Sequence, residues 1–122
     1  MSGVKISIND ADITQVISRL NKFGNKAKDE VSAITKKTAL QISNDAKKLA
    51  PVRTSFLRKN IRASRAKSMV KVVSGAKYSS YVEYGTSKQG AQPFMRPAFE
   101  KGRATYKKAL YSALNKLTRF PK

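Results

Sequence analysis

The sequence carries few side chains that could perform acid–base, nucleophilic or metal chemistry. It contains no His and no Cys, so the commonest general base, the thiolate nucleophile and the zinc-thiolate ligands are all missing. Its 7 acidic residues occur singly or as near neighbours, whereas a two-metal nuclease or a glycosidase needs carboxylates that converge. The residue types therefore predict a protein that is not an enzyme, with no catalytic residue, no metal ligand and no cofactor.

Two pairs of neighbouring carboxylates fall near the starts of expected helices. Asp10 and Asp12 lie at the start of an apolar helical pattern. An acid there caps free N–H groups and favours the helix dipole, so capping is expected rather than metal binding. Asp29 and Glu30 lie next to lysines on a longer helical pattern and are expected to be solvated.

Glu83 stands alone in the most aromatic stretch of the chain. A partly buried carboxylate suits the bidentate geometry of a guanidinium, so Arg58 and Arg96 are its expected partners. The alternative is an exposed Glu83 that lies beside chance cations.

Positive charge dominates the composition. The chain has 26 Lys and Arg against 7 Asp and Glu, a formal net charge of +19, and residues 46–82 contain no carboxylate. A field of this sign attracts polyanions, so nucleic acid, an acidic protein surface and anionic lipid are all open as neighbours. A solvated face that only maintains solubility is the alternative.

A small set of regular elements must position these groups. Hydrophobic residues alternate with polar ones at the start of the chain, as in a strand with one buried face. They then recur every three or four positions, which is helical spacing, before and after a β-branched stretch that indicates a hairpin. The expected order is a strand at 4–8, a helix from about Asp10 to Gly24, a helix at 25–49 that ends before Pro51, a hairpin at 61–74 and a last helix from near Pro97.

The 25–49 helix is the longest expected element, and its inward stripe should comprise Ala27, Val31, Ile34, Thr38, Ile42, Ala46 and Leu49. Two other segments have less definite patterns. Residues 78–84 fit either a helical turn or a strand. Residues 86–92 are polar and are expected to form a mobile loop that becomes ordered on a partner, or else an idle surface loop.

The fold class that follows is α+β, in one domain over residues 1–122. We expect a small sheet with a β-hairpin, packed against one long helix and a C-terminal helix. No apolar run approaches the roughly 20 residues that span a bilayer, so no membrane partner is expected.

Three segments, in order, resemble the tail-completion, or head–tail joining, proteins of long-tailed bacteriophages. Residues 50–58 read A-P-V-R-T-S-F-L-R and resemble A-P-V-x-T-G-x-L-R, with Ser55 where the family has Gly. Residues 78–86 read Y-S-S-Y-V-E-Y-G-T and resemble Y-A-x-Y-V-E-F-G-T. Residues 91–98 read A-Q-P-F-M-R-P-A and resemble A-Q-P-F-L-R-P-A.

The resemblance implies a structural virion protein that forms a homo-oligomeric ring, typically a hexamer, at the head-proximal end of the tail. Its partners would be other copies of itself, the head connector or stopper protein, the tail tube or tail terminator protein, and DNA passing through the channel. It would reside in the neck of the virion, and in the host cytoplasm during assembly. The residues expected at the assembly interface are Arg53, Arg58, Tyr81, Glu83, Tyr84, Gly85, Gln92, Phe94 and Arg96.

Most of the bases are then expected to meet acidic protein neighbours. A minority near the hairpin would face DNA, namely Lys59, Arg62, Arg65, Lys67 and Lys71. A small architectural protein that binds double-stranded DNA through phosphate contacts is the competing class. A nuclease or toxin is disfavoured by the small number of acids.

Overall fold

The structure is a computed structural model that describes residues 4–8, 10–50, 59–63, 70–76, 79–87 and 90–119. Its fold is α+β, as the sequence predicts. In chain order the elements are β1 (Val4–Ile8), α1 (Ala11–Asn21), α2 (Asn25–Leu49), β2 (Ile61–Ala63), β3 (Val70–Ser74), α4 (Ser79–Tyr84) and α5 (Met95–Arg119).

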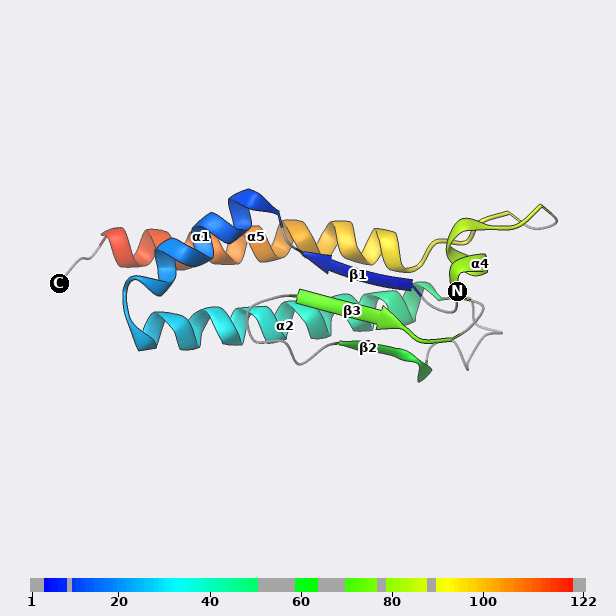
Figure 1. The fold of residues 1–122 in the computed structure, drawn as a ribbon, viewed down its shortest axis with the longest axis horizontal. Coiled ribbons are helices and arrows are strands. Elements are labelled where there is room, and N and C mark those ends of the chain that lie inside the picture. The colour runs from blue at the N-terminus through cyan, green and yellow to red at the C-terminus, as the bar shows by residue number, and fades with distance from the viewer. Residues whose placement is uncertain are drawn as a thin grey trace.

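The two long helices form one layer and the sheet forms a second. Helices α2 and α5 lie side by side and run in opposite directions (Figure 1). The sheet packs on this pair, with β2 and β3 against α2 and β1 against α5, while α1 packs on both helices. The molecule is elongated, and α4 lies at the opposite end from the turn that joins α1 to α2 (Figure 1).

The sheet is antiparallel in the order β1-β3-β2. This confirms the expected first strand and the two strands of the hairpin, while residues 64–69, where the hairpin turn is expected, lie outside the described residues. Val70 and Val72 are buried against the helices, whereas Lys71 and Val73 are only partly buried, as the two-residue period of a strand requires. Residues 79–84 are helical, which resolves the ambiguity of that segment.

Helix α2 has the predicted bounds, but its last inward position differs from the prediction. Ala46 is buried and Ala50, four residues later, is buried as well, whereas Leu49 is among the exposed large hydrophobic residues. A helix turns about 100° per residue, so the adjacent positions Leu49 and Ala50 point in clearly different directions, and only Ala50 faces the core. The prediction that Leu49 faces the core is therefore wrong, and Ile34, another residue of the predicted stripe, is only partly buried.

A glycine sets how closely the long helices cross. Gly102 of α5 is buried, and a Cβ at this position would overlap the Cγ1 and Cδ1 atoms of Ile42 on α2. Beside this crossing, the buried Tyr106 hydroxyl lies 2.8 Å from Thr35 Oγ1, which itself donates to the carbonyl of Val31. Tyr106 is thus the donor to Thr35, and burial raises the pKa of its phenol.

The acids of α1 tie this helix to α5. Asp10 is the N-cap residue of α1, but its side chain makes no capping hydrogen bond and accepts instead from Arg103 Nε. Asp12 Oδ2 accepts from Lys107 Nζ at 2.5 Å. This hydrogen bond lowers the pKa of Asp12 and raises the pKa of Lys107. The predicted capping role of the Asp10 side chain is wrong, because a guanidinium on the neighbouring helix supplies a charged donor.

Candidate functional site

The candidate site lies at the end of the molecule where α4 meets the start of α5. Glu83, on α4, is only 4% exposed. Its Oε1 accepts from the main-chain N–H of Phe94 at 3.0 Å and of Met95 at 2.8 Å, and its Oε2 accepts from the N–H of Arg96 at 3.0 Å. The carboxylate of one helix therefore binds the N-terminus of another.

This contact satisfies every free donor at the start of α5. The first four N–H groups of a helix have no partner within it. Here they belong to positions 94–97, and Pro97 has no N–H, so three donors remain. Phe94 precedes the first helical residue and has no side-chain acceptor with which to cap them. Glu83 supplies that acceptor from outside the helix, with a charge that the helix dipole favours.

Helix α4 is itself fixed at both ends. Ser79 Oγ donates to the carbonyl of Ala76 at 2.7 Å and lies 2.7 Å from Ser74 Oγ, so the hydroxyl of Ser74 donates to that of Ser79. At the other end, Gly85 donates to the carbonyl of Tyr81 and has a φ of +81°, which favours glycine. The buried Ser74 and Ser79 were not recognised in the sequence, because nothing local shows that a strand end and a helix start share a hydroxyl pair.

The segment between α4 and α5 returns against α4. The N–H of Gln92 donates to the carbonyl of Val82 at 2.8 Å, so the segment that follows α4 comes back against it before α5 begins. The coil predicted for residues 86–92 is seen at its described positions, and its mobility stays a prediction.

Two tyrosines project from this fixed helix into solvent. Tyr81 is 61% exposed and Tyr84 is 65% exposed. Residues three apart lie on the same side of a helix, so the two rings form one aromatic surface. Tyr84 also lines a cavity of about 180 Å³ with Arg96, beside the buried Glu83. Tyrosine and arginine are the residue types that contribute most to protein–protein interfaces.

The structure thus separates the expected interface residues into two groups. Tyr81, Tyr84, Gln92 and Arg96 are exposed at this end of the molecule, whereas Glu83 and Phe94 are buried and can act only by positioning the others. Gly85 is partly buried and ends α4. Arg53 and Arg58 lie outside the described residues.

The prediction that the Arg96 guanidinium pairs with Glu83 is wrong. That residue reaches the carboxylate through its main-chain N–H, and Glu83 is in none of the ion pairs formed within the described part of the chain. The guanidinium is not needed, because three amides already occupy the two carboxylate oxygens. Arg58, the other candidate, is not among the described residues.

Some of the bases expected to face DNA share one face of the sheet. In the sheet register, Val73 of β3 pairs with Arg62 of β2 on one side and with Lys5 of β1 on the other. Lys71 lies two residues before Val73 on the same strand. Paired residues point to the same side, so Arg62, Lys71 and Lys5 lie on the outer face. Lys5 was missed, although its alternation with Val4 and Ile6 already placed it opposite the core. Lys59 is exposed just before β2, and Arg65 and Lys67 lie outside the described residues.

Within the described ranges, no group of three or more acidic, His or Cys residues that could hold a metal ion occurs. Among the same residues, no helix is long and apolar enough to cross a bilayer.

The α+β fold thus presents two exposed tyrosines on α4, a short helix whose buried Glu83 caps α5. Residues 14–85, more than half of the chain, match the family described as "Bacteriophage HK97-gp10, putative tail-component". The chain belongs to this family, which makes it a phage tail-related structural protein of the virion. No curated protein and no solved structure matches it significantly.

Proposed function

We propose that the protein completes the phage tail as a ring at its head-proximal end, joining the tail to the head connector and leaving a channel for DNA. A hexamer is the proposed stoichiometry. The tail tube or tail terminator protein would lie on one side of the ring and the head connector or stopper protein on the other. The protein would act without catalysis, in the neck of the virion, after assembly in the host cytoplasm.

The fixed aromatic surface of Tyr81 and Tyr84 is the observation that carries this proposal. A monomer gains nothing by exposing two large rings on one short helix, and this helix is held by a buried carboxylate, a serine pair and a C-terminal glycine. Rings that are already ordered lose little conformational entropy on binding, which favours their use as interface anchors. We propose that this surface, with Gln92 and Arg96, contacts the neighbouring copy or the connector, and that Arg53 and Arg58 belong to the same interface.

Replacement of both tyrosines tests this interface. A truncated interface anchor costs about 2 kcal/mol or more, so Tyr81→Ala with Tyr84→Ala should weaken ring formation or docking onto purified tails at least about 30-fold. Tyr111→Ala is the matched control, because Tyr111 is another partly exposed tyrosine, on α5. Sedimentation measures the ring, and electron microscopy of necks measures docking. If all variants assemble like the wild type, α4 is not the interface.

The charge of the assembly requires anionic neighbours. Each copy carries a formal +19, so copies in a ring repel one another unless partners compensate. We propose that acidic surfaces on the connector and tail proteins contact most of the basic residues. Because salt screens such contacts, docking should weaken as the salt concentration rises past about 0.15 M, where the Debye length is about 8 Å.

The outer face of the sheet is the proposed DNA-facing surface. It carries Arg62 and Lys71 together with Lys5, and the proposal extends to Lys59, Arg65 and Lys67 of the same region. The test replaces Arg62 and Lys71 with Gln. Normal assembly with abnormal DNA release or retention would support the channel assignment, whereas failed joining with unchanged DNA behaviour would assign these bases to a protein interface.

The same basic face favours the competing class, a small architectural protein that binds duplex DNA through its phosphates. Such a protein would bind free duplex as a single protomer with a strong salt dependence. Titration of a short duplex, together with sedimentation, distinguishes the two functions, because a stable ring that lacks affinity for free duplex excludes the competing class.

A further inference from the structure

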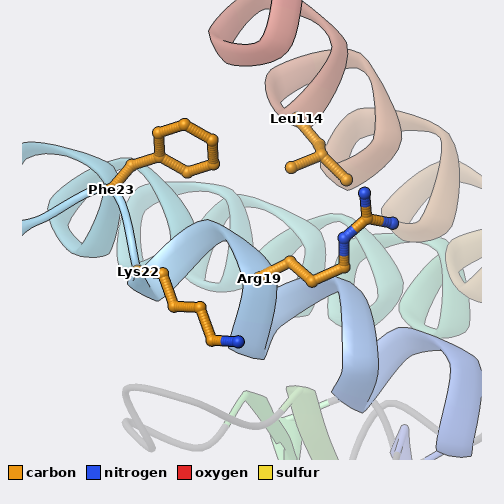
Figure 2. A pocket seen from close by; sticks show the side chains of 4 residues that line it. All are labelled: Arg19, Lys22, Phe23 and Leu114. Carbon is orange, nitrogen blue, oxygen red and sulfur yellow. The ribbon is translucent and has the colours of Figure 1, made fainter.

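A groove opens at the end of the molecule opposite α4. It is lined by Arg19, Lys22 and Phe23, at the C-terminal end of α1 and the turn that follows, and by Leu114 of α5. Figure 2 shows the Arg19 side chain extending toward Leu114, with the Phe23 ring across the opening. We name this the Phe23 groove.

The apolar part of the Phe23 groove consists of Phe23 and Leu114. Phe23 is 46% exposed and is not one of the residues packed in or against the hydrophobic core, whereas Leu114 belongs to it. The N–H of Phe23 donates to the carbonyl of Leu20 at 3.0 Å, and Gly24, with a φ of +103°, turns the chain into α2. A large ring is therefore presented to solvent by an ordered turn.

The charged part of the groove has no acidic counterpart in the described chain. Neither Arg19 nor Lys22 takes part in an ion pair among the described residues, where the ion pairs join Asp10, Asp12 and Asp45 to bases of α5. An apolar centre with a polar rim is the usual anatomy of a protein interface, and charges across an interface are complementary, so this cationic rim fits an acidic partner. The complementary surface is an apolar side chain flanked by carboxylates.

We propose that the Phe23 groove binds an acidic segment of a partner protein, which inserts one apolar side chain between Phe23 and Leu114 and places carboxylates on Arg19 and Lys22. The groove volume is about 290 Å³, at the lower limit of the roughly 300–1,000 Å³ of small-molecule sites, so it suits a single side chain. A second copy is a poorer occupant, because each copy carries +19. This binding site is additional to the α4 interface of the proposed function and lies at the opposite end of the elongated molecule.

A short acetylated peptide with a central Leu-Phe pair flanked by Asp and Glu is the probe. Its binding to the full chain is measured by fluorescence anisotropy, and amide shift changes in NMR spectra should centre on Arg19, Phe23 and Leu114. Arg19→Gln with Lys22→Gln removes both proposed ion pairs with the peptide and should raise the Kd about 10-fold. Phe23→Ser should raise it at least as much, and circular dichroism checks that this variant folds.

The control variant, Lys36→Gln with Lys37→Gln, removes the same charge from exposed positions of α2 and should leave the Kd within about twofold. An equal loss in this control, equal affinity for an Asn/Gln version of the peptide, or no binding to the wild type would overturn the proposal. Preference for a DNA duplex at the same residues, or self-association abolished by Phe23→Ser, would also overturn it. The variants at Tyr81 and Tyr84 should bind the peptide normally, so failure of the α4 interface and failure of the groove are distinguishable.

Discussion

Replacing Glu83 with Gln tests whether a side chain from α4 holds the start of α5. The amide of Gln keeps one accepting oxygen and replaces the other with an NH₂ group, which donates. At least one of the three main-chain N–H groups of Phe94, Met95 and Arg96 therefore loses its acceptor.

The expected loss follows from this geometry. A hydrogen bond to a charged group contributes about 1.5–3 kcal/mol, and a negative charge at a helix N-terminus adds about 0.3–1 kcal/mol. The free energy of unfolding should fall by about 2–4 kcal/mol. A chain of this length has roughly 6–18 kcal/mol of stability, so the variant should remain folded and measurable.

Urea titration followed by circular dichroism gives the free energy of unfolding, with the slope m as a check on two-state behaviour. Glu100→Gln is the control, because it removes one charge from an exposed position of α5, the helix that Glu83 caps, and should change stability by less than about 0.5 kcal/mol. Hydrogen exchange at the Phe94 and Met95 amides gives a local measurement, and both should exchange faster in the Glu83 variant. Equal stability of the two variants together with unchanged exchange would refute the capping role.

Three further predictions concern the contacts of α5. Gly102→Ala should destabilise the protein by up to about 2 kcal/mol in urea titrations, because overpacking of the helix crossing costs about 1–3 kcal/mol and the better helix propensity of Ala offsets only about 1 kcal/mol of it. Thr35→Val should cost about 1–3 kcal/mol by leaving the buried Tyr106 hydroxyl without its acceptor, whereas the double variant with Tyr106→Phe should recover most of that loss. The pKa of Asp12 lies below its ordinary value of 3.8 because Lys107 donates to it, so the stability from this pair is present above pH 3.8 and is lost as the pH falls through the lowered pKa. Carboxyl NMR titration should show the pKa of Asp12 returning toward 3.8 in Lys107→Gln.

Local patterns in the sequence were sufficient for most of the regular elements, but they left α4 ambiguous between a helical turn and a strand. The bounds of α2 follow from helical spacing and a closing proline, and those of β1 follow from the alternation of Val4, Ile6 and Ile8. The hairpin follows from β-branched residues at 70–73. These features depend on neighbours within a few positions, and the chain itself supplies that information. Leu49 was wrongly predicted to face the core, because both the third and the fourth residue after Ala46 fit helical spacing and the pattern does not choose between them.

The ordered motifs also indicated the family, and the composition indicated a protein without the usual catalytic groups. Glu83 was recognised as unusual from its isolation among aromatic residues. Its predicted partner was an arginine because a sequence displays charged side chains, whereas main-chain N–H groups occur at every residue and become available only where a helix begins.

Long-range contacts were decided by the tertiary structure alone. The pairing of Asp10 with Arg103, the hydroxyl pair of Thr35 and Tyr106, and the close approach at Gly102 each join residues far apart in the chain. The same packing brought three bases to one face of the sheet and left Phe23 exposed at one end. Many pairings satisfy the same local preferences, and only the simultaneous burial of the apolar faces of α2, α5 and the sheet selects one register and one set of neighbours.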